Sequence, residues 1–334
     1  MDELDLTDDF GIQNPTLRAM MIPRYIGSYC ALKFDIETET CVVLTANLVD
    51  SPHSNYKIAL KCIPKNNYRA SEVDIMSQVR HPNIINFIDS FEYNEKEPHF
   101  YVIAMAHAYQ DLIGYFEDNS NISLINSARI IYDILNALKY LHQNGIWHRD
   151  IKPDNIFIVD FTDQVPLVAI GDFGLSIKYD YETFVGEGTG TTHYAAPELI
   201  EEKCDPYGFH KIEFKAMAEY SNNVDIWSLG IIFFFLLFGK EPFYFEDGTF
   251  DIKSRLTGSI NFANYVMMYP DLAEPIDLLA QMLNPDGKKR ISANAALEHS
   301  WFKTMGIYGT PPPPTQNYYQ LNNFAGNYET LVVD

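Results

Sequence analysis

The sequence predicts an α+β fold, with a small antiparallel β part first and a larger helical part after it. The spacing of the apolar residues changes about one third of the way along the chain. Up to about residue 105 they occur in short runs separated by polar turns, which is typical of strands. After Asp111 they recur at three- and four-residue spacing, which is typical of helices. The 334 residues, 47% of them apolar, are enough to bury a sizeable core.

The first part is expected to be an antiparallel meander with one helix. Polar turns at residues 35–40 and 50–55 separate its first three strands. A short helical stretch follows, and two further strands come after it. The expected strands span residues 26–34, 41–49, 56–63, 84–93 and 99–105, and the expected helix spans residues 69–79.

The second part is expected to consist mainly of helices, at residues 123–144, 224–238, 272–283 and 293–299. The most apolar run, residues 226–239, is too short to cross a bilayer and is followed by Lys240. We therefore expect a buried helix in this run and no membrane association.

Charge and cysteine content narrow the expected partners and compartment. Acidic residues outnumber basic residues 45 to 24, which gives a net charge of −21. Nucleic acids and anionic membranes are bound through clustered Lys and Arg residues, so neither is an expected partner. The first five residues lack the basic and apolar regions of a secretory signal, so we expect a protein of the cytoplasm or the nucleus. Four widely spaced cysteines, Cys30, Cys41, Cys62 and Cys204, are expected to be free thiols.

Short motifs occur in a fixed order along the chain. His148–Asn155 (HRDIKPDN) follows the expected long helix and precedes a short apolar strand. Asp172–Gly174 (DFG) follows another apolar run, and Ala196–Glu198 (APE) comes later. Upstream, Ala59–Lys61 lies on the third expected strand and Glu72 on the expected helix. Any one tripeptide occurs by chance, but the ordered set does not.

With these motifs, the sequence resembles the catalytic domain of serine/threonine protein kinases over roughly residues 25–304. Gly27–Tyr29 and His193–Glu198 are most similar to the calcium/calmodulin-dependent and AMP-activated group. The resemblance implies a bilobal kinase domain, with a small lobe at residues 22–106 and a large lobe at residues 107–304. An acidic N-terminal tail is expected at residues 1–21, and a tail rich in Pro, Tyr and Asn at residues 305–334.

The resemblance also implies roles for these residues in phosphoryl transfer from ATP. Asp150 is expected to accept the proton of the substrate hydroxyl. Lys152 resembles the lysine that serine/threonine kinases use near the γ-phosphate. Asn155 and Asp172 offer hard oxygen ligands for Mg²⁺. The expected cofactors are therefore ATP and Mg²⁺.

Further residues are expected to bind the nucleotide or to stabilise the domain. Lys61 is expected to bind the α- and β-phosphates, with Glu72 orienting its ammonium group. Only eleven residues separate the two, fewer than is usual in kinases, so the helix or the loop before it is shortened. Val43 and Ala59 are also expected at the cofactor. Glu198 and Arg290 resemble a buried ion pair that stabilises the large lobe.

The glycine-rich turn of the family is missing. Protein kinases cover the ATP phosphates with such a turn between the first two strands, but this chain has no glycine between Gly27 and Gly114. The expected turn, residues 35–40, contains three carboxylates instead. Two unit charges about 4 Å apart repel by about 1 kcal/mol in water and about 4 kcal/mol at an effective dielectric constant of about 20. We therefore expect weakened ATP affinity.

Two functions stay open at this point. The first is an active serine/threonine kinase, which the retained Lys61, Asp150, Asn155 and Asp172 favour. The second is a kinase-like scaffold with impaired catalysis, which the glycine-free turn favours. Such a scaffold is expected to bind partners through its tails or through an unusually long insertion at about residues 199–224.

Two acidic residues are expected to influence which protein substrates are bound, and the same insertion is a candidate docking element. Asp111 and Asp154 occupy positions where kinases that prefer basic sequences carry acidic residues, so protein substrates rich in Arg or Lys are expected. The middle of the insertion, residues 207–220, is either a docking helix or a surface elaboration.

The activation segment contains a carboxylate where many kinases carry a phosphorylated residue. Nine positions before the Ala of the APE motif stands Glu187, which is expected to pair with Arg149. Thr191 resembles the threonine that orients the catalytic aspartate. The alternative is that Glu187 is a solvated loop residue.

If the carboxylate of Glu187 replaces a phosphate, the protein has basal activity without an upstream kinase. The variant Glu187→Ala is then expected to transfer less phosphate than the wild type, because Arg149 loses its anionic partner. A phosphate-transfer assay on the unphosphorylated protein measures this. Full activity in the variant would contradict the pairing.

Overall fold

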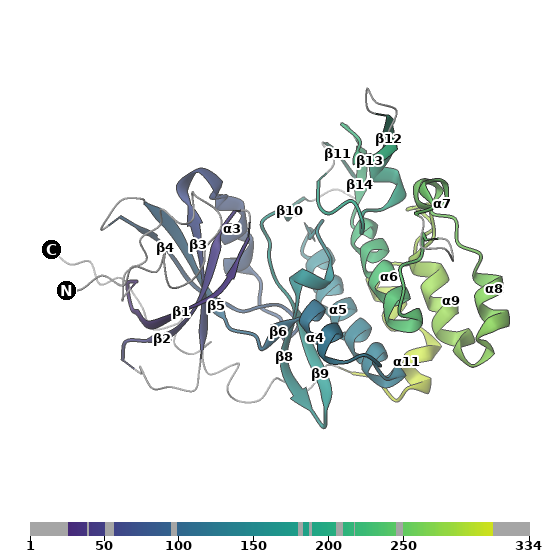
Figure 1. Ribbon diagram of the computed structural model, residues 1–334, viewed down its shortest axis with the longest axis horizontal. Coiled ribbons are helices and arrows are strands. Elements are labelled where there is room, and N and C mark those ends of the chain that lie inside the picture. The colour runs from purple at the N-terminus through teal and green to yellow at the C-terminus, as the bar shows by residue number, and fades with distance from the viewer. Residues whose placement is uncertain are drawn as a thin grey trace. The chain divides into compact units, whose positions relative to one another are not determined.

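The computed structural model describes residues 26–38, 40–50, 57–94, 99–179, 183–186, 189–204, 210–216, 218–244 and 250–309 (Figure 1). These residues form two compact units, one of residues 26–80 and 85–109 and the other of residues 81–84 and 110–309. The first unit is rich in strands and the second in helices, which confirms the predicted α+β class.

The first unit is built on a five-stranded antiparallel sheet with the strand order β1-β2-β3-β5-β4. The predicted meander and its helix are both present, with bounds shifted by a few residues. The elements are β1 (Tyr29–Glu37), β2 (Val42–Leu48), β3 (Ile58–Pro64), a short 3-10 turn (Lys65–Asn67), α3 (Ala70–Gln78), β4 (Phe87–Tyr93) and β5 (Phe100–Ala106).

The two faces of this sheet differ because side chains alternate along each strand. The buried face carries Val42 and Leu44 of β2, Leu60 and Cys62 of β3, and Val102 of β5 within one hydrophobic cluster. The other face therefore carries the intervening residues of the same strands. Of the predicted free thiols, Cys30, Cys41 and Cys62 are confirmed, and the side chain of Cys204 lies outside the described part.

The second unit contains the remaining elements. Its strands are β6 (Gln110–Asp111), β7 (Ile146–Trp147), β8 (Ile156–Thr162), β9 (Val165–Ile170), β10 (Ile177–Lys178), β11 (Thr183–Gly186), β12 (Ile200–Cys204), β13 (His210–Phe214) and β14 (Ala218–Ser221). Its helices are α4 (Leu112–Asp118), α5 (Leu124–Gln143), α6 (Asn223–Phe238), α7 (Ile252–Thr257), α8 (Phe262–Met268), α9 (Ala273–Met282), α10 (Ala293–Leu297) and α11 (Ser300–Thr304). Single 3-10 turns span Pro153–Asn155, Pro197–Leu199 and Pro270–Leu272.

Helices α5 and α6 pack against each other in the core of this unit (Figure 1). The Ser123 hydroxyl caps α5 by accepting a hydrogen bond from the backbone N–H of Asn126 (3.3 Å). Helix α6 is apolar around nearly its whole circumference and almost entirely buried, as its sequence predicts. It ends at Gly239, whose φ of 65° lies in the left-handed region. Among the described residues, no helix is long and apolar enough to cross a bilayer.

The described residues of the insertion form strands, so of the two alternatives left open for residues 207–220 the docking helix is wrong for them and the surface elaboration stays. Strand β12 pairs with β13 in an antiparallel hairpin, and β14 pairs with β11 of the activation segment. In β13, Ile212 and Phe214 alternate with Lys211 and Glu213, which is the two-residue period of a strand. Lys203 on β12 forms an ion pair with Glu213 across the hairpin (3.0 Å).

Most of the two predicted tails lies outside the described residues. The exception is residues 305–309, at the start of the predicted C-terminal tail. Here Ile307 is buried, and the Tyr132 hydroxyl donates a hydrogen bond to the Gly309 carbonyl oxygen (3.1 Å). These residues pack on the second unit.

A buried carboxyl group in α5 makes the stability of the second unit depend on pH. Asp133 is fully buried, and burial raises its pKa to about 7 although Arg129 lies 2.9 Å away and opposes the shift. The folded protein therefore keeps a proton that the unfolded chain releases near its ordinary pKa of about 4. The free energy of unfolding should fall as the pH rises from about 4 to about 7.

The variant Asp133→Asn removes this titration. We expect the variant to lose less stability than the wild type between pH 5 and pH 8, by on the order of 1–3 kcal/mol, because an asparagine at position 133 does not titrate. Chemical denaturation at the two pH values measures the difference. Asp118→Asn, an exposed aspartate at the end of α4, is the control. An equal effect of Asp133→Asn at both pH values would contradict the assignment.

Candidate active site

In the first unit, Lys61 and Glu72 form a buried ion pair. The Lys61 Nζ lies 2.6 Å from the Glu72 Oε1, and their side chains are 13% and 5% exposed. Lys61 comes from the middle of β3 and Glu72 from the first turn of α3. The chain between them consists of the end of β3, the short 3-10 turn and the start of α3, which is enough to bring the two side chains together. The structure thus brings these two predicted site residues together.

The sheet face that carries Lys61 also carries the predicted Val43 and Ala59. Val43 is directly opposite Lys61 in the β2–β3 pairing, and Ala59 is directly opposite Met105 in the β3–β5 pairing. All of these side chains are partly exposed. On the same face, Thr45 hydrogen-bonds to the His107 ring (3.0 Å). Strand register therefore adds Thr45 to this surface, which spacing in the sequence alone did not identify, and it places Met105 there as well.

The turn between β1 and β2 is shorter than predicted. Strand β1 continues through Asp35 and Glu37, so that Glu37 pairs with Val42. The Thr38 hydroxyl accepts hydrogen bonds from the backbone N–H groups of Thr40 (3.2 Å) and Cys41 (3.1 Å). These bonds close the turn with a side chain and without glycine.

Two of the three carboxylates of this region, those of Asp35 and Glu37, lie in the described part. The Asp35 carboxylate lies 3.9 Å from the His107 ring and is about half exposed. Burial lowers the pKa of His107, which Asp35 raises by a smaller amount. Glu39 lies outside the described residues. The Asp35 carboxylate is therefore directed toward His107.

In the second unit, a hydrogen-bond network surrounds the Asp150 carboxylate. The Thr191 hydroxyl donates to Oδ1 (2.9 Å), and the Lys152 ammonium lies 3.1 Å from Oδ2. Lys152 also donates to the Thr191 hydroxyl (3.2 Å). The Asn155 amide donates to Oδ2 (3.1 Å) and to the Asp150 carbonyl oxygen (2.8 Å). Four predicted site residues thus share one network.

Asp172 lies on the segment that follows β9, at the start of the DFG motif. Its φ of 58° is in the left-handed region, which is uncommon for a residue other than glycine. Its Oδ1 accepts a hydrogen bond from the Gly174 N–H (3.3 Å), and the side chain is exposed. Phe173 is fully buried against the His148 ring, with 5.1 Å between the ring centroids. Within this motif Phe173 is therefore buried in the core, and Asp172 is exposed at the surface.

The buried carboxylate of Asp225, in the first turn of α6, holds the loop before Asp150. It accepts hydrogen bonds from the backbone N–H groups of His148 (3.0 Å) and Arg149 (2.8 Å) and contacts the His142 ring (2.9 Å). Arg149 has a φ of 66°. Burial opposes ionisation of Asp225, but these hydrogen bonds and the nearby histidines outweigh it and hold the pKa below its ordinary value.

Arg149 itself is turned toward the DFG segment. Its Nε donates a hydrogen bond to the carbonyl oxygen of Leu175 (2.8 Å). The predicted partner, Glu187, lies outside the described residues. Gly190 passes so close to this loop that an added Cβ would lie 2.6 Å from the Arg149 carbonyl oxygen. A glycine is therefore required at position 190, directly before Thr191, and the sequence alone did not reveal this requirement.

The two acidic residues expected to bind substrate arginines differ in their surroundings. Asp111 caps α4, because its Oδ1 accepts a hydrogen bond from the Gly114 N–H (2.8 Å). Asp154 lies exposed in the turn Pro153–Asn155, which packs against β6, where Asp111 stands. Asp111 thus has a structural role as the N-cap of α4, in keeping with its position directly before the first residue of that helix.

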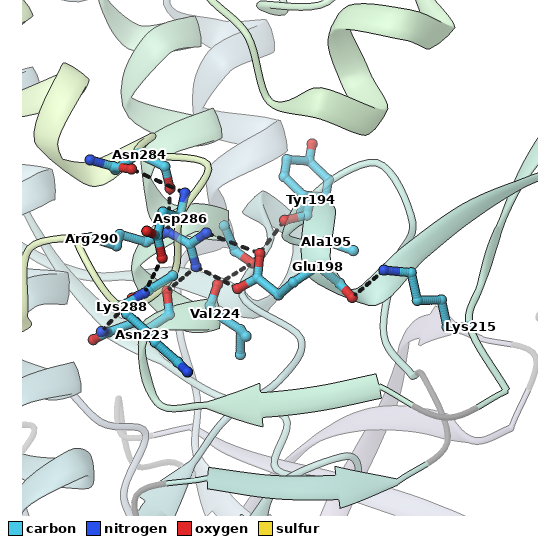
Figure 2. A network of polar contacts seen from close by, with 12 residues as sticks. Tyr194, Ala195, Glu198, Lys215, Asn223, Val224, Asn284, Asp286, Lys288 and Arg290 are labelled. Atoms are coloured by element: carbon cyan, nitrogen blue, oxygen red, sulfur yellow. Dashed lines mark hydrogen bonds and ion pairs between the residues drawn. The ribbon is translucent and has the colours of Figure 1, made fainter.

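An ion pair between Glu198 and Arg290 stabilises the region after the activation segment (Figure 2). The two side chains form parallel hydrogen bonds of 2.9 and 3.0 Å, and the Arg290 guanidinium is fully buried. Arg290 also donates to the carbonyl oxygen of Asn223, at the start of α6 (3.0 Å). The carbonyl oxygen of Glu198 accepts from Lys215, which follows β13, so the insertion is tied to the same network.

Comparisons with known proteins agree with this geometry. A family model described as the protein kinase domain matches residues 45–302. The calcium/calmodulin-dependent protein kinase type 1B of Rattus norvegicus is 32% identical over 256 residues, which cover 74% of this chain and 68% of that protein. Calcium-dependent protein kinase 4 of Plasmodium berghei (strain Anka) is 28% identical over 262 residues, 76% of this chain and 46% of that protein. The probable serine/threonine-protein kinase fhkD of Dictyostelium discoideum is 32% identical over 235 residues, 70% of this chain and 30% of that protein.

A lysine on the third strand paired with a glutamate on the following helix, a loop that carries an aspartate and an asparagine, and a DFG motif after it are typical of protein kinases. The chain belongs to the protein kinase domain family. Its relatives are kinases of the serine/threonine type, and it is of that type as well.

The role of Asp225 can be tested by replacing its carboxylate with an amide. Asp225→Asn cannot accept all three hydrogen bonds, so we expect a loss of about 2–4 kcal/mol in the free energy of unfolding. We also expect faster hydrogen exchange at the amides of His148 and Arg149. Denaturant titration and exchange mass spectrometry measure the two effects.

A matched control is available on the surface of the same unit. Asp277 contacts the His299 ring at 3.0 Å but is 68% exposed, so Asp277→Asn is expected to change stability by less than about 1 kcal/mol. Equal losses in the two variants would contradict the anchoring role of Asp225.

Proposed function

We propose that this chain transfers the γ-phosphoryl group of ATP, with Mg²⁺, to serine or threonine hydroxyl groups of protein substrates. The hydroxyl oxygen forms a bond to the γ-phosphorus as the bond to the bridging oxygen of ADP breaks. ADP leaves with that electron pair, and the hydroxyl proton goes to Asp150. The observation that carries the proposal is the network of Thr191, Lys152 and Asn155 around the Asp150 carboxylate.

Within this network, each neighbour of Asp150 has a distinct task. Thr191 and Asn155 restrict the rotation of the carboxylate, which keeps an oxygen directed at the incoming hydroxyl. Lys152, at 3.1 Å from Asp150, supplies a positive charge where the γ-phosphoryl oxygens are expected. The protein thus provides alignment and charge, which is what phosphoryl transfer requires.

The donor set fits a magnesium ion that is also bound by phosphates. The Asn155 amide nitrogen donates to Asp150, which directs its carbonyl oxygen away from that residue. Asp172 adds an exposed carboxylate. Mg²⁺ is commonly held by one or two protein oxygens plus substrate phosphates, and when bound it offsets phosphate charge. Within the described ranges, no group of three or more His, Cys, Asp or Glu side chains could hold a metal by itself.

We propose that Lys61, oriented by Glu72, binds the α- and β-phosphates, and that Val43 and Ala59 contact the base. The buried ion pair at 2.6 Å supports this, because it fixes the ammonium at one place on the sheet. Nucleotide affinity is proposed to be weakened, since the turn after β1 lacks the glycines that would let its backbone approach the phosphates.

The proposed substrates are proteins with Arg or Lys residues near the phosphorylated position. The exposed Asp154, on the turn that contains Asn155, supports this preference. The net charge of −21 also favours basic partners. We propose residues 22–304 as the catalytic domain, in agreement with the family match to residues 45–302.

A second candidate function is a kinase-like scaffold that binds nucleotide weakly and does not transfer phosphate. The glycine-free turn is the observation that favours it. The two functions differ in one measurable property, which is phosphate transfer by the purified protein.

The test is a radiolabelled-phosphate transfer assay on a basic peptide library. We expect transfer by the wild type that depends on Mg²⁺, and a loss of at least about 100-fold in Asp172→Ala, because a metal ligand is removed. Asp118→Ala, an exposed aspartate in α4, is the control and should retain activity. No transfer together with thermal stabilisation by Mg·ATP would favour the scaffold, and no stabilisation at millimolar ATP would contradict the active enzyme.

A further inference from the structure

Arg255 in α7 is one of the largest fully buried side chains of the second unit, with 1% of its surface exposed. Its Nη2 donates hydrogen bonds to the carbonyl oxygens of Thr192 (2.6 Å) and Ala195 (2.6 Å) and to that of His193 (3.3 Å). The two N–H groups of this nitrogen thus serve three carbonyl oxygens of a single loop, and the longer contact to His193 shares a hydrogen with a shorter one. The ring of Phe243 lies 5.4 Å below the guanidinium carbon.

The positive charge of Arg255 is stabilised by the dipoles of the backbone carbonyl groups that it contacts and by the negative charges of Glu241 and Glu198. Its hydrogen-bond acceptors within the described ranges are backbone carbonyl oxygens. Burial lowers the pKa of Arg255 to about 10, and the charges of Glu241 and Glu198 oppose that shift. The group therefore remains charged near neutral pH, and its position is determined by the loop that it contacts.

The remaining carbonyl oxygen of this loop is held from a second helix. The Ser228 hydroxyl of α6 donates a hydrogen bond to the carbonyl oxygen of Tyr194 (2.9 Å). Arg255 and Ser228 together bind the four consecutive carbonyl oxygens of residues 192–195. Two buried side chains from two helices therefore hold the carbonyl side of this loop, with the Ser228 hydroxyl sharing its one proton with the carbonyl oxygen of Val224 (3.2 Å).

The loop begins next to the network around Asp150. Thr191, which precedes it, donates its hydroxyl to Asp150 and accepts a backbone hydrogen bond from Tyr194 (3.0 Å). A hollow beside this point is lined by Asp150, Thr191 and Tyr194, among others. A displacement of residues 192–195 would therefore move the Thr191 hydroxyl away from the Asp150 carboxylate.

We propose that Arg255 is a positioning residue, which fixes the loop of residues 191–195 so that Thr191 orients Asp150 toward the substrate hydroxyl. The proposal rests on the proposed kinase function for its catalytic consequence, whereas the effect on the loop is independent of activity. Arg255 acts on the part of the site that receives the substrate hydroxyl, so the affinity for the nucleotide should not depend on it.

The chemistry of the guanidinium makes the variants informative. Arg255→Met keeps a long side chain but leaves three buried carbonyl oxygens without their donor. Arg255→Lys keeps the charge and the donor capacity, but its shorter side chain places the ammonium group away from the position of Nη2. Lys253→Met, an exposed position on the same helix, is the matched control.

The first readout is hydrogen exchange in the peptide that covers residues 191–199. We expect about 10-fold or faster exchange there in Arg255→Met, a smaller increase in Arg255→Lys, and no change in Lys253→Met. This readout does not require catalysis. If the wild type transfers no phosphate but the exchange pattern appears, the kinase function fails and the effect of Arg255 on the loop stands.

The second readout is steady-state kinetics with a peptide substrate. We expect kcat/KM for the peptide to fall about 10- to 100-fold in Arg255→Met, with partial recovery in Arg255→Lys and the KM for ATP within about 2-fold of the wild type. Unchanged exchange in residues 191–199 would overturn the proposal. So would a parallel loss of ATP affinity and peptide transfer in both Arg255 variants, since that result indicates a general folding defect.

Discussion

The second unit depends on the buried carboxylate of Asp225. This one group accepts hydrogen bonds from the backbone of His148 and Arg149 and contacts His142. It thereby stabilises the left-handed conformation of Arg149, which an L-residue adopts at a cost. That conformation determines the direction in which the chain leaves toward Asp150. The position of Asp150, the proposed catalytic base, therefore depends on the hydrogen bonds that Asp225 accepts from the two residues before it, His148 and Arg149.

Helix α6 explains why that contact is stable. Because it is apolar around its circumference, it is buried on every side, and its few polar groups face packed chain segments. Three of these lie near its N-terminus: Asp225 binds the loop before Asp150, the Asn223 carbonyl binds Arg290, and Ser228 binds the carbonyl of Tyr194. A single helix thus sets the relative positions of the loop at residues 148–150, the ion pair of Glu198 and the loop at residues 191–195.

Local sequence patterns predicted the parts of the molecule whose structure is determined locally. The meander of the first unit and helices α5 and α6 carry strong periodicity, and short motifs identified Lys61, Asp150, Asn155 and Asp172. The pattern was ambiguous at residues 210–214, where Ile212 and Phe214 fit a strand only once β12 supplies a partner. Asp111 stays a predicted substrate residue, and its hydrogen bond to Gly114 gives it a capping role that the sequence analysis did not include. Arg255 had no signal at all, because its contacts are with residues far away in the chain.

The pairing of β11 with β14 has a consequence for the chain entropy of the activation segment. Residues 183–186 and 218–221 form an antiparallel ribbon, so the chain between Gly186 and Ala218 is a loop closed at its base. A closed loop has far fewer conformations than a free one, and the entropy cost of closure rises only slowly with length. Thr191 and the carbonyl groups held by Arg255 lie inside this closed loop. A sequence change in the insertion that weakens the pairing of β11 with β14 is therefore expected to give residues 191–195 more conformational freedom without touching any of them.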